Sequence, residues 1–414
     1  MTRPFTCLDY SSYKMKKDSR SFNAPRMQVI QATFGTFHHF HLARELRSRG
    51  HLQHIYSTYP WRRLRREGIP HEYVTTFPWM HVLHLAARHY LPLPNRVNAF
   101  FLRTVGTSFD EWLCSQITEC DAYVALSGAG EKSGPHAQKL GARYICDRGS
   151  SHARYQRQIM LEEYSRWKVP IPEPDPRFLA REESEYETAD AITVLSEFAR
   201  RTFIENGVPA HKIHKTLLGV QIDAFRPVTE PSAETFEVLF VGALSFRKGI
   251  PYLLEAFRRL RHPRKRLRLV GAITREIQPF LKSQDLTDVE ITGPRPQSEL
   301  ASIMSRSHVL VLPSVEDGFG MVITQAMACG CPVISSINTG GPDLYRDRIE
   351  GFIVPIRSPE AIHTALQQLA DDPALRQSMG EASLRIVQSL GGWHQYGENY
   401  TNLLKKLCYR HAEA

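Results

Sequence analysis

The stretch His308–Ser336, HVLVLPSVEDGFGMVITQAMACGCPVISS, decides the fold of this chain. It begins with an apolar strand at His308–Leu312, passes through a loop at 313–318, and continues into a helix that ends at Cys329-Gly330. A second apolar strand, Cys331–Ser335, follows directly. A strand, a glycine turn, a helix and a second strand form one βαβ unit of a parallel sheet, and the connection in such a unit is right-handed.

The start of the predicted helix has the features of an anion-binding site. Gly318 and Gly320 flank this position, and glycine lets a ligand approach the backbone closely. The first N–H groups of a helix have no partner within it and carry partial positive charge. Asp317 lies at the same position, and Gln325 follows eight residues later, within the helix.

These residues resemble the motif of the family 4 retaining glycosyltransferases of the GT-B fold, also called glycosyl transferases group 1. That motif is usually written EGFGLxxxEAMACGxPVV, and the chain reads DGFGMVITQAMACGCPVI. The alignment places Asp317 at the first glutamate and Gln325 at the second. A frame that begins at Glu316 would place Thr324 at the second position and break the spacing of the glycine turn, so we prefer Asp317.

The resemblance implies an α/β fold of two facing, doubly wound, Rossmann-like domains with a cleft between them. In it Asp317 would hold sugar hydroxyls and Gln325 would hold ribose hydroxyls, a role that an amide can fill because it both accepts and donates. The loop with Gly293 and Pro294 would hold the base. The residues implied to bind the donor are Gly242, Gly293, Pro294, Gly318, Phe319, Gly320, Met321, Val322 and Gln325.

Two basic residues stand just before the first predicted helix of the second domain. Arg247 and Lys248 lie in the turn between the strand Glu237–Gly242 and the helix Ile250–Leu260. A surface basic pair is the simplest interpretation of such a sequence. The strand-turn-helix context favours a functional one, because two cations and a helix N-terminus then converge on one point. The family has this pair at the same place, facing the nucleotide diphosphate.

The length of 414 residues exceeds one ordinary core and predicts two domains. We expect an N-terminal extension at 1–26 and an acceptor-side domain at 27–227. A sugar-nucleotide-binding domain should follow at 228–390, after the polar linker VTEPSAE. A final helix at 391–414 resembles the family's tail, which crosses back to the first domain.

Charge and composition narrow the possible partners and location. The net charge of +9 suits an anionic partner such as a nucleotide, a phospholipid surface or nucleic acid. The seven cysteines are scattered and do not indicate a disulfide framework. The polar, basic N-terminus has no apolar signal region, and no apolar run is long enough to span a membrane, so we expect a cytoplasmic protein.

The first domain begins with the strand Met27–Ala32 and a turn that contains one glycine, Gly35. His38, His39 and His41 follow at the start of a helix. This spacing is not a standard set of metal ligands on one helix face. We expect histidines that face solvent or an acceptor cleft, and no metal site.

A polar loop, DRGSSH, follows the strand Ala142–Cys146. Parallel α/β sheets place ligands just beyond the carboxyl ends of their strands. Asp147 stands where the resembling family often has a histidine that faces the sugar, and we count it with Arg247, Lys248 and Asp317 as a catalytic candidate. It could orient an acceptor hydroxyl, and it could equally form a structural pair with Arg148.

Arginines alternate with aromatic residues after the second strand: Trp61, Arg62, Arg63, Arg65, Arg66 and Trp79. Such a mixture is typical of an interfacial surface that could contact anionic lipid at the inner face of a membrane. A solvated basic loop beside a core helix at Met80–Tyr90 explains it equally well. Nucleic-acid binding is the weaker hypothesis, because no binding motif accompanies the charge.

The sequence therefore favours a retaining, hexosyltransferase-type enzyme that moves a sugar from a nucleotide-diphosphate sugar to a glycan or lipid-linked acceptor, as in polysaccharide biosynthesis. We expect no cofactor and no metal, since Arg247 and Lys248 supply cations at the phosphates. Two alternatives stay open: a non-catalytic relative that binds sugar nucleotides, and a sugar-nucleotide epimerase of the same fold.

Overall fold

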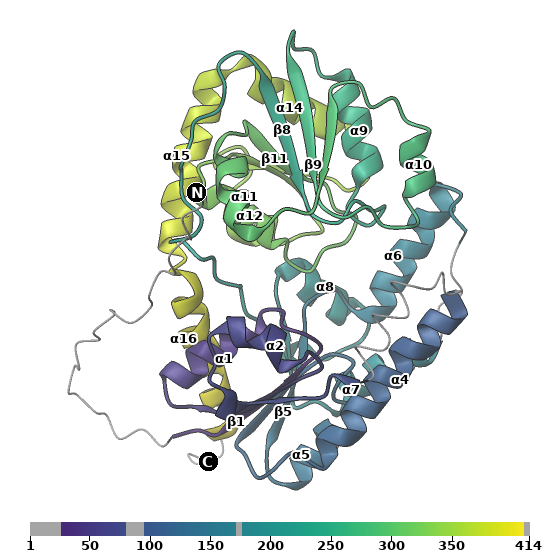
Figure 1. Ribbon diagram of the computed structural model, residues 1–414, viewed down its shortest axis with the longest axis vertical. Coiled ribbons are helices and arrows are strands. Elements are labelled where there is room, and N and C mark those ends of the chain that lie inside the picture. The colour runs from purple at the N-terminus through teal and green to yellow at the C-terminus, as the bar shows by residue number, and fades with distance from the viewer. Residues whose placement is uncertain (1–25, 80–94, 171–175, 410–414) are drawn as a thin grey trace, which may run out of the picture.

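The computed structural model describes residues 26–79, 95–170 and 176–409, and it has two α/β domains that lie one above the other in Figure 1. Each domain is built on one parallel sheet with helices on both faces. The predicted fold class, two facing Rossmann-like domains, is confirmed. The expected extension at 1–26 falls almost wholly outside the described residues, as does the expected helix at Met80–Tyr90.

The first domain holds a seven-stranded sheet with the order β3-β2-β1-β4-β5-β6-β7, in which every neighbouring pair is parallel. Its strands are β1 (Val29–Thr33), β2 (Leu52–Ser57), β3 (Val74–Thr76), β4 (Ala122–Leu126), β5 (Arg143–Arg148), β6 (Ala191–Val194) and β7 (Ile213–Lys215). Its helices are α1 (His39–Ser48), α2 (Trp61–Leu64), α4 (Asn95–Cys114), α5 (Ser133–Lys139), α6 (Ala153–Arg166), α7 (Pro176–Thr188) and α8 (Glu197–Glu205).

The second domain holds a six-stranded parallel sheet with the order β10-β9-β8-β11-β12-β13. Its strands are β8 (Phe236–Val241), β9 (Lys265–Val270), β10 (Val289–Gly293), β11 (Val309–Leu312), β12 (Val333–Ser336) and β13 (Gly351–Val354). Its helices are α9 (Ile250–Arg259), α10 (Gln278–Lys282), α11 (Gln297–Ser305), α12 (Met321–Ala328), α13 (Gly341–Leu344), α14 (Pro359–Asp371) and α15 (Pro373–Ser389).

Three predicted boundaries were wrong by a few residues. Strand β5 runs through Arg148, so Asp147 belongs to the strand and not to the loop after it, because β4 pairs with Asp147 and β6 pairs with both Asp147 and Arg148. Strand β7 ends at Lys215, whereas the sequence predicts a strand over Ile213–Leu218, three residues longer. Strand β12 begins at Val333, since Cys331 still belongs to the turn closed by its N–H bond to Ala326.

Two helices pack across the boundary between the domains. Helix α16 (Gly392–Tyr409) follows the second domain and packs on α1 of the first, where Trp393 stacks on His41 with 3.8 Å between ring centroids. Helix α6 leans toward the second domain (Figure 1), and Trp167 just beyond its end contacts Phe246, with 6.0 Å between centroids.

Both chain crossings between the domains meet at one place. A Cβ atom on Gly219, in the connection from the first domain, would lie 2.5 Å from the carbonyl carbon of Gly392, where α16 begins. Gly392 itself has a φ of +64°, which favours glycine. The two connections therefore touch backbone to backbone.

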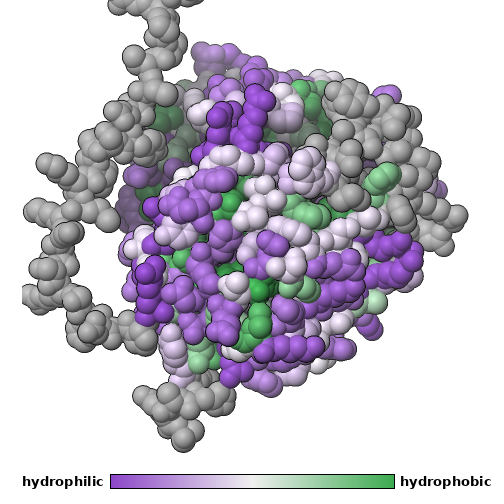
Figure 2. Space-filling model, turned by 60° about the horizontal axis from the view of Figure 1, so that its bottom comes forward, coloured by the Kyte–Doolittle hydropathy of each residue, from purple (hydrophilic) through white to green (hydrophobic). Residues whose placement is uncertain are grey.

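The surface seen when the bottom of Figure 1 is turned forward is mostly hydrophilic, with hydrophobic residues in small patches (Figure 2). Among residues 26–79, 95–170 and 176–409, no helix combines the length and the apolar character that a membrane span requires. Arg62, Arg63, Arg65 and Arg66 are all exposed, and Trp79 is 75% exposed.

Candidate active site

A cavity of about 550 Å³ opens between the two domains. It lies where the carboxyl ends of strands from both sheets face each other, which is the position at which open parallel sheets bind ligands. Its lining from the first domain is Phe37, His38, His41, Leu126, Ser127, Arg148, Gly149, Ser150, Gln156, Leu195 and Leu218. Its lining from the second domain is Val241, Gly242, Arg247, Lys248, Leu312, Asp317, Phe319, Gly320, Met321 and Val322.

The second domain brings its two predicted motifs together in this cavity. Arg247 and Lys248 lie in the turn between β8 and α9, which ends at Gly249 with a φ of +72°. A Cβ atom on Gly249 would lie 2.1 Å from the carbonyl oxygen of Pro313, so the turn packs directly on the loop after β11. Gly320, with a φ of +79°, then starts α12. Glycine is required at both turns, and this close packing fixes the cations beside the start of α12.

Both cations are paired with carboxylates from the loop before α12. Arg247 Nη1 lies 2.9 Å from Glu316 Oε2, and Lys248 Nζ pairs with Asp317 Oδ2. Burial opposes the charge of Arg247, but Glu316 and then Asp317 outweigh it and raise the pKa of the guanidinium. These four groups form a balanced set of two cations and two anions. An anionic ligand that reaches Arg247 and Lys248 therefore competes with carboxylates of the protein itself.

Glu316 joins the two domains. Its carboxylate accepts hydrogen bonds from the Ser150 hydroxyl at 2.7 Å, the Ser151 N–H at 3.1 Å and the Ser151 hydroxyl at 2.8 Å. It also accepts from the Gln156 amide and from Arg247, both at 2.9 Å. Burial opposes ionisation, yet Arg247 and these donors lower the pKa of Glu316 to about 2. One fully buried carboxylate thus ties the loop before α12 to the loop after β5.

The same two loops are in backbone contact. A Cβ atom on Gly318 would lie 2.1 Å from the carbonyl oxygen of Gly149, so only glycine fits at this position without a shift. Gly149 and Ser150 also line the cavity. Gly318 itself is not in the lining: it serves the contact between the domains.

Four further predicted residues lie outside the lining. Gln325 is 8% exposed and lies within α12, more than one turn after its start. Gly293 ends β10 with a φ of +71° and has open space where a Cβ would be, and Pro294 beside it is exposed. The fourth residue, Asp147, is buried and contacts His38, which lines the cavity. The cavity therefore contains the predicted diphosphate and sugar residues, while the predicted base and ribose residues lie outside its lining.

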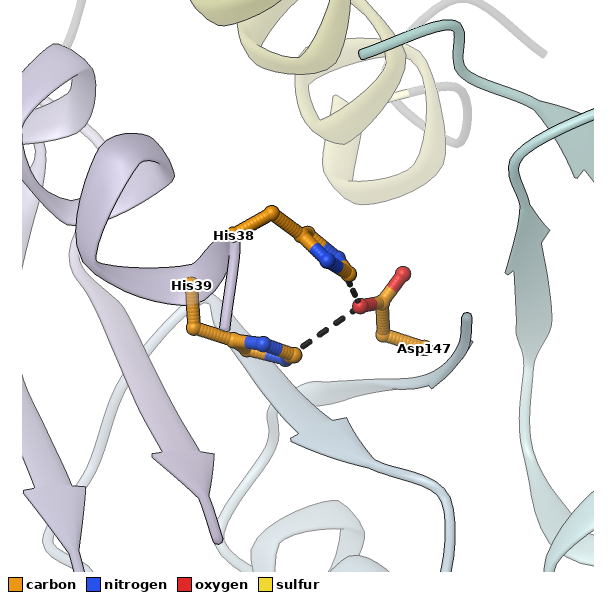
Figure 3. Close-up of side chains that lie close together, drawn as sticks. All are labelled: His38, His39 and Asp147. Atoms are coloured by element: carbon orange, nitrogen blue, oxygen red, sulfur yellow. Dashed lines mark hydrogen bonds and ion pairs between the residues drawn. The ribbon is translucent and has the colours of Figure 1, made fainter. Parts of the chain in front are cut away.

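Of the two roles left open for Asp147, the structural pair with Arg148 is wrong. Successive residues of a strand point to opposite faces of the sheet, so these side chains diverge. Arg148 pairs with Glu182 and donates from Nε to the Ser151 carbonyl oxygen at 3.1 Å. Asp147 instead accepts a hydrogen bond from His38 Nε2 at 2.6 Å (Figure 3).

Asp147 is the centre of a buried polar cluster. Its Oδ2 also lies 3.2 Å from His39 Nε2 (Figure 3), and its Oδ1 accepts from the Thr193 hydroxyl at 2.5 Å. Burial opposes ionisation of Asp147, but the attraction of His38, then His39 and the bond from Thr193, lower its pKa to about 2. Asp147 is thus a carboxylate at neutral pH.

The expectation that all three histidines face solvent or a cleft was wrong for His39. His38 and His41 line the cavity, but His39 is fully buried beneath α1, because a helix turns its adjacent positions by about 100° onto different faces. Burial lowers the pKa of His39 to about 3, despite the nearby Asp147. His38, His39 and Asp147 form the one group of three potential metal ligands in the described part of the chain, with ligand atoms within 4.8 Å of one another.

Sequence reasoning missed Glu316 as part of the site, and it missed the contact of His38 with Asp147. Glu316 lies next to Asp317, and only the rejected reading frame pointed to it. His38 lies 109 residues from Asp147, and its only sequence signal is its place at the end of the first strand's turn. Both residues owe their positions to contacts between distant segments.

Comparison with known proteins agrees with this geometry. Residues 221–385 match the family model described as Glycosyl transferases group 1. A D-inositol 3-phosphate glycosyltransferase from Kribbella flavida is 27% identical over 286 residues, which are 58% of this chain and 67% of that protein. WcaL from Escherichia coli, a putative colanic acid biosynthesis glycosyltransferase, is 28% identical over 190 residues, 43% of this chain and 47% of that protein.

A solved structure of HepE from Anabaena, in complex with UDP, superposes with a TM-score of 0.67 at 16% identity. The superposition covers 92% of this chain and all of HepE, whereas the sequence matches span 67% and 47% of the two relatives' own lengths. At such low identity the superposition shows the fold alone. The second domain of the chain is therefore similar to glycosyl transferases group 1, and the two domains together have the GT-B fold.

Proposed function

We propose that this protein is a retaining, metal-independent glycosyltransferase that moves a sugar from a nucleotide-diphosphate sugar to a glycan or lipid-linked acceptor. One observation carries the proposal: Arg247, Lys248 and Asp317 line one interdomain cavity with the first residues of α12. This combination gives a cationic place for phosphates next to a carboxylate for sugar hydroxyls. The family match of the second domain supports the same reaction class.

The difficult step is the departure of the nucleotide diphosphate from the anomeric carbon. Negative charge grows on the phosphate oxygens and positive charge grows on the sugar as this bond breaks. Arg247, Lys248 and the partial positive charge at the start of α12 stabilise the leaving diphosphate because they are fixed where its charge develops. Protein cations thus fill the role that a divalent ion would have.

The pairs Arg247–Glu316 and Lys248–Asp317 describe the protein without its donor. Phosphate oxygens would replace a carboxylate at each cation. The carboxylate of Asp317 would then be released from Lys248 and could accept hydrogen bonds from sugar hydroxyls. Donor binding therefore exchanges one set of charge-assisted bonds at the two cations for another, while Glu316 keeps the hydrogen bonds from Ser150, Ser151 and Gln156.

The chemical class of the donor and acceptor rests on relatives. HepE has been solved with UDP and with UDP-glucose, which supports a nucleotide-diphosphate sugar as the donor here. Colanic acid and amylovoran biosynthesis appear in the names of sequence relatives, which supports a glycan or lipid-linked acceptor. The exposed arginines of α2 and the residues after it support peripheral contact with an anionic membrane that carries such an acceptor.

The test is a panel of sugar nucleotides assayed for release of the diphosphate and for transfer, with the anomeric configuration of the product determined by NMR. We expect turnover of at least one donor with retention. Lys248→Ala should lower it at least ~100-fold, the scale of one lost transition-state donor. Arg264→Ala is the matched control, because Arg264 is exposed on the second domain and pairs only with the exposed Glu234 among the ion pairs of the described residues. This variant should keep full turnover.

Two outcomes would contradict the proposal. Tight nucleotide binding without turnover of any donor would make the protein a binding relative. Conversion of a donor to its epimer without an acceptor would make it an epimerase. Equal turnover in Lys248→Ala and Arg264→Ala would remove Lys248 from the mechanism.

A further inference from the structure

An exposed phenylalanine lies on the first-domain side of the interdomain cavity. Phe37 is 64% exposed and lines this cavity. The other large hydrophobic residues that are exposed in the described part of the chain lie outside the lining: Trp79, Ile204, Val228, Ile273, Ile337 and Ile349. Water therefore contacts an apolar ring at the place where a substrate would bind, and a ligand that covers this ring gains free energy.

The backbone of Phe37 has a conformation that residues with a side chain rarely adopt. Its φ is +38°, in the left-handed region that favours glycine. Within the described residues, Phe37 belongs to neither hydrophobic core, whereas Phe34 in the same turn packs on Phe109 with 5.6 Å between ring centroids. Core packing thus does not explain the strained backbone of Phe37. Strain of this kind is typical of a position that contacts a ligand.

The turn that carries Phe37 is fixed on both sides. Before it, the Ser57 hydroxyl donates a hydrogen bond to the Gly35 carbonyl oxygen at 2.7 Å. After it, His38 Nε2 lies 2.6 Å from Asp147 Oδ2. These bonds hold the turn in one conformation before a ligand arrives, which lowers the entropic cost of binding to the Phe37 ring.

The first-domain wall of the cavity combines this ring with polar groups. The lining there includes His41, the Ser127 hydroxyl and the Gln156 amide, as well as the apolar Leu126. An alkyl chain would need a continuous apolar surface. A sugar ring has one apolar face of C–H groups and an edge of hydroxyls, so it matches a wall on which an aromatic ring lies among donors and acceptors.

We propose that Phe37 is a specificity-determining residue for the acceptor and that its ring stacks on the apolar face of an acceptor sugar; this rests on the proposed glycosyl transfer. The acceptor is then a glycan, free or lipid-linked, that presents a sugar unit to the cavity. Phe37 has no group that exchanges a proton. It positions the acceptor and takes no part in the bond changes that decide the anomeric configuration.

The test is saturation-transfer NMR with methyl β-D-glucopyranoside, methyl β-D-galactopyranoside and methyl α-D-mannopyranoside, with UDP and, separately, GDP present. We expect the wild type to bind at least one glycoside, with the strongest transfer at the C–H protons of one ring face. Phe37→Ala should weaken this binding about tenfold, because it removes the apolar contact. Phe37→Trp should keep it, because tryptophan offers another aromatic face. Nucleotide affinity and melting temperature should not change in either variant.

Ile349→Ala is the control, because it removes an exposed apolar side chain outside the cavity, and it should match the wild type. Equal glycoside binding by the wild type and Phe37→Ala overturns this inference alone, as does a wild type that binds none of the three glycosides. Binding of decyl phosphate that Phe37→Ala abolishes, without binding of a glycoside, would assign the ring to a lipid chain and also overturn it. A wild type that binds a glycoside through Phe37 but turns over no donor overturns the proposed function and the acceptor role with it, so the NMR signal separates the two failures.

Discussion

Replacing Glu316 with glutamine should loosen the contact between the two domains. The glutamine amide keeps the shape of the side chain but removes its negative charge. That charge strengthens the hydrogen bonds that the carboxylate accepts from Arg247 and from four donor groups of Ser150, Ser151 and Gln156. A pKa of about 2, against 4.5 for a free glutamate, measures how strongly this environment prefers the charge. At about 1.4 kcal/mol for each tenfold change, the preference is worth about 3 kcal/mol, and the side chain is fully buried.

The expected result is a shift toward the open arrangement worth at most about 3 kcal/mol, or on the order of 100-fold in the ratio of closed to open molecules, because Arg247 belongs to the same domain as Glu316 and stays paired with it. Small-angle X-ray scattering measures the change in the radius of gyration. The fluorescence of Trp167, which contacts Phe246 across the interface, reports separation of the domains. Glu360→Gln is the matched control, because Glu360 is 68% exposed and pairs with Arg259 on the surface.

Acid should produce the same opening in the wild type. Glu316 has a folded-state pKa below its unfolded value, so its contribution is present above about pH 4.5 and is lost as the pH falls toward 2. Parting of the domains favours protonation of the carboxylate, because it removes the donors of Ser150, Ser151 and Gln156. If Glu316→Gln and Glu360→Gln gave the same scattering curve and the same urea midpoint, the reasoning about this carboxylate would be refuted.

Three other predictions concern the donor, metals and membranes. Gln325→Ala should weaken nucleotide-diphosphate binding by about 1–3 kcal/mol, because it strands ribose hydroxyls, while Gln325→Glu should stay within roughly tenfold of the wild type; unchanged affinity in the alanine variant, by calorimetry, would show that the residue makes no ribose contact. Transfer should survive chelation of divalent ions, and complete loss that magnesium or manganese restores would contradict a phosphate site made of Arg247 and Lys248. Sedimentation with anionic vesicles should retain the protein at low salt and release it at high salt, since each exposed arginine near the surface adds about 1 kcal/mol that salt screens; equal recovery with neutral vesicles would exclude a role for Arg62 and Arg63.

Local sequence signals predicted the two sheets well. The stretch from His308 to Ser336 has the order strand, loop, helix, strand in the structure, and Gly320 takes the positive φ that its place before the helix requires. Such features depend on periodicity and on glycine, which act within a few residues. The same local logic brought Arg247, Lys248 and Asp317 to one cavity.

The missed parts of the site depend on partners far along the chain. Glu316 is a charged residue in a loop, and nothing near it in sequence indicates that Ser150 and Gln156 meet it from the other domain. The sequence offered Arg148 as one possible partner of Asp147, but strand alternation separates the two and the start of α1 brings His38 instead. Sequence patterns of one element carry no information on which element packs opposite.

The contact between Gly219 and Gly392 has a mechanical consequence for the cavity. The chain passes from one domain to the other twice, and both connections run through this point. The domains therefore cannot separate as two bodies joined by independent linkers. The available motion is a rotation of one domain against the other about an axis that passes through the two glycines. Any such rotation that widens the cavity draws the loop of Glu316 away from the loop of Ser150, so it breaks the four hydrogen bonds that Glu316 accepts from Ser150, Ser151 and Gln156.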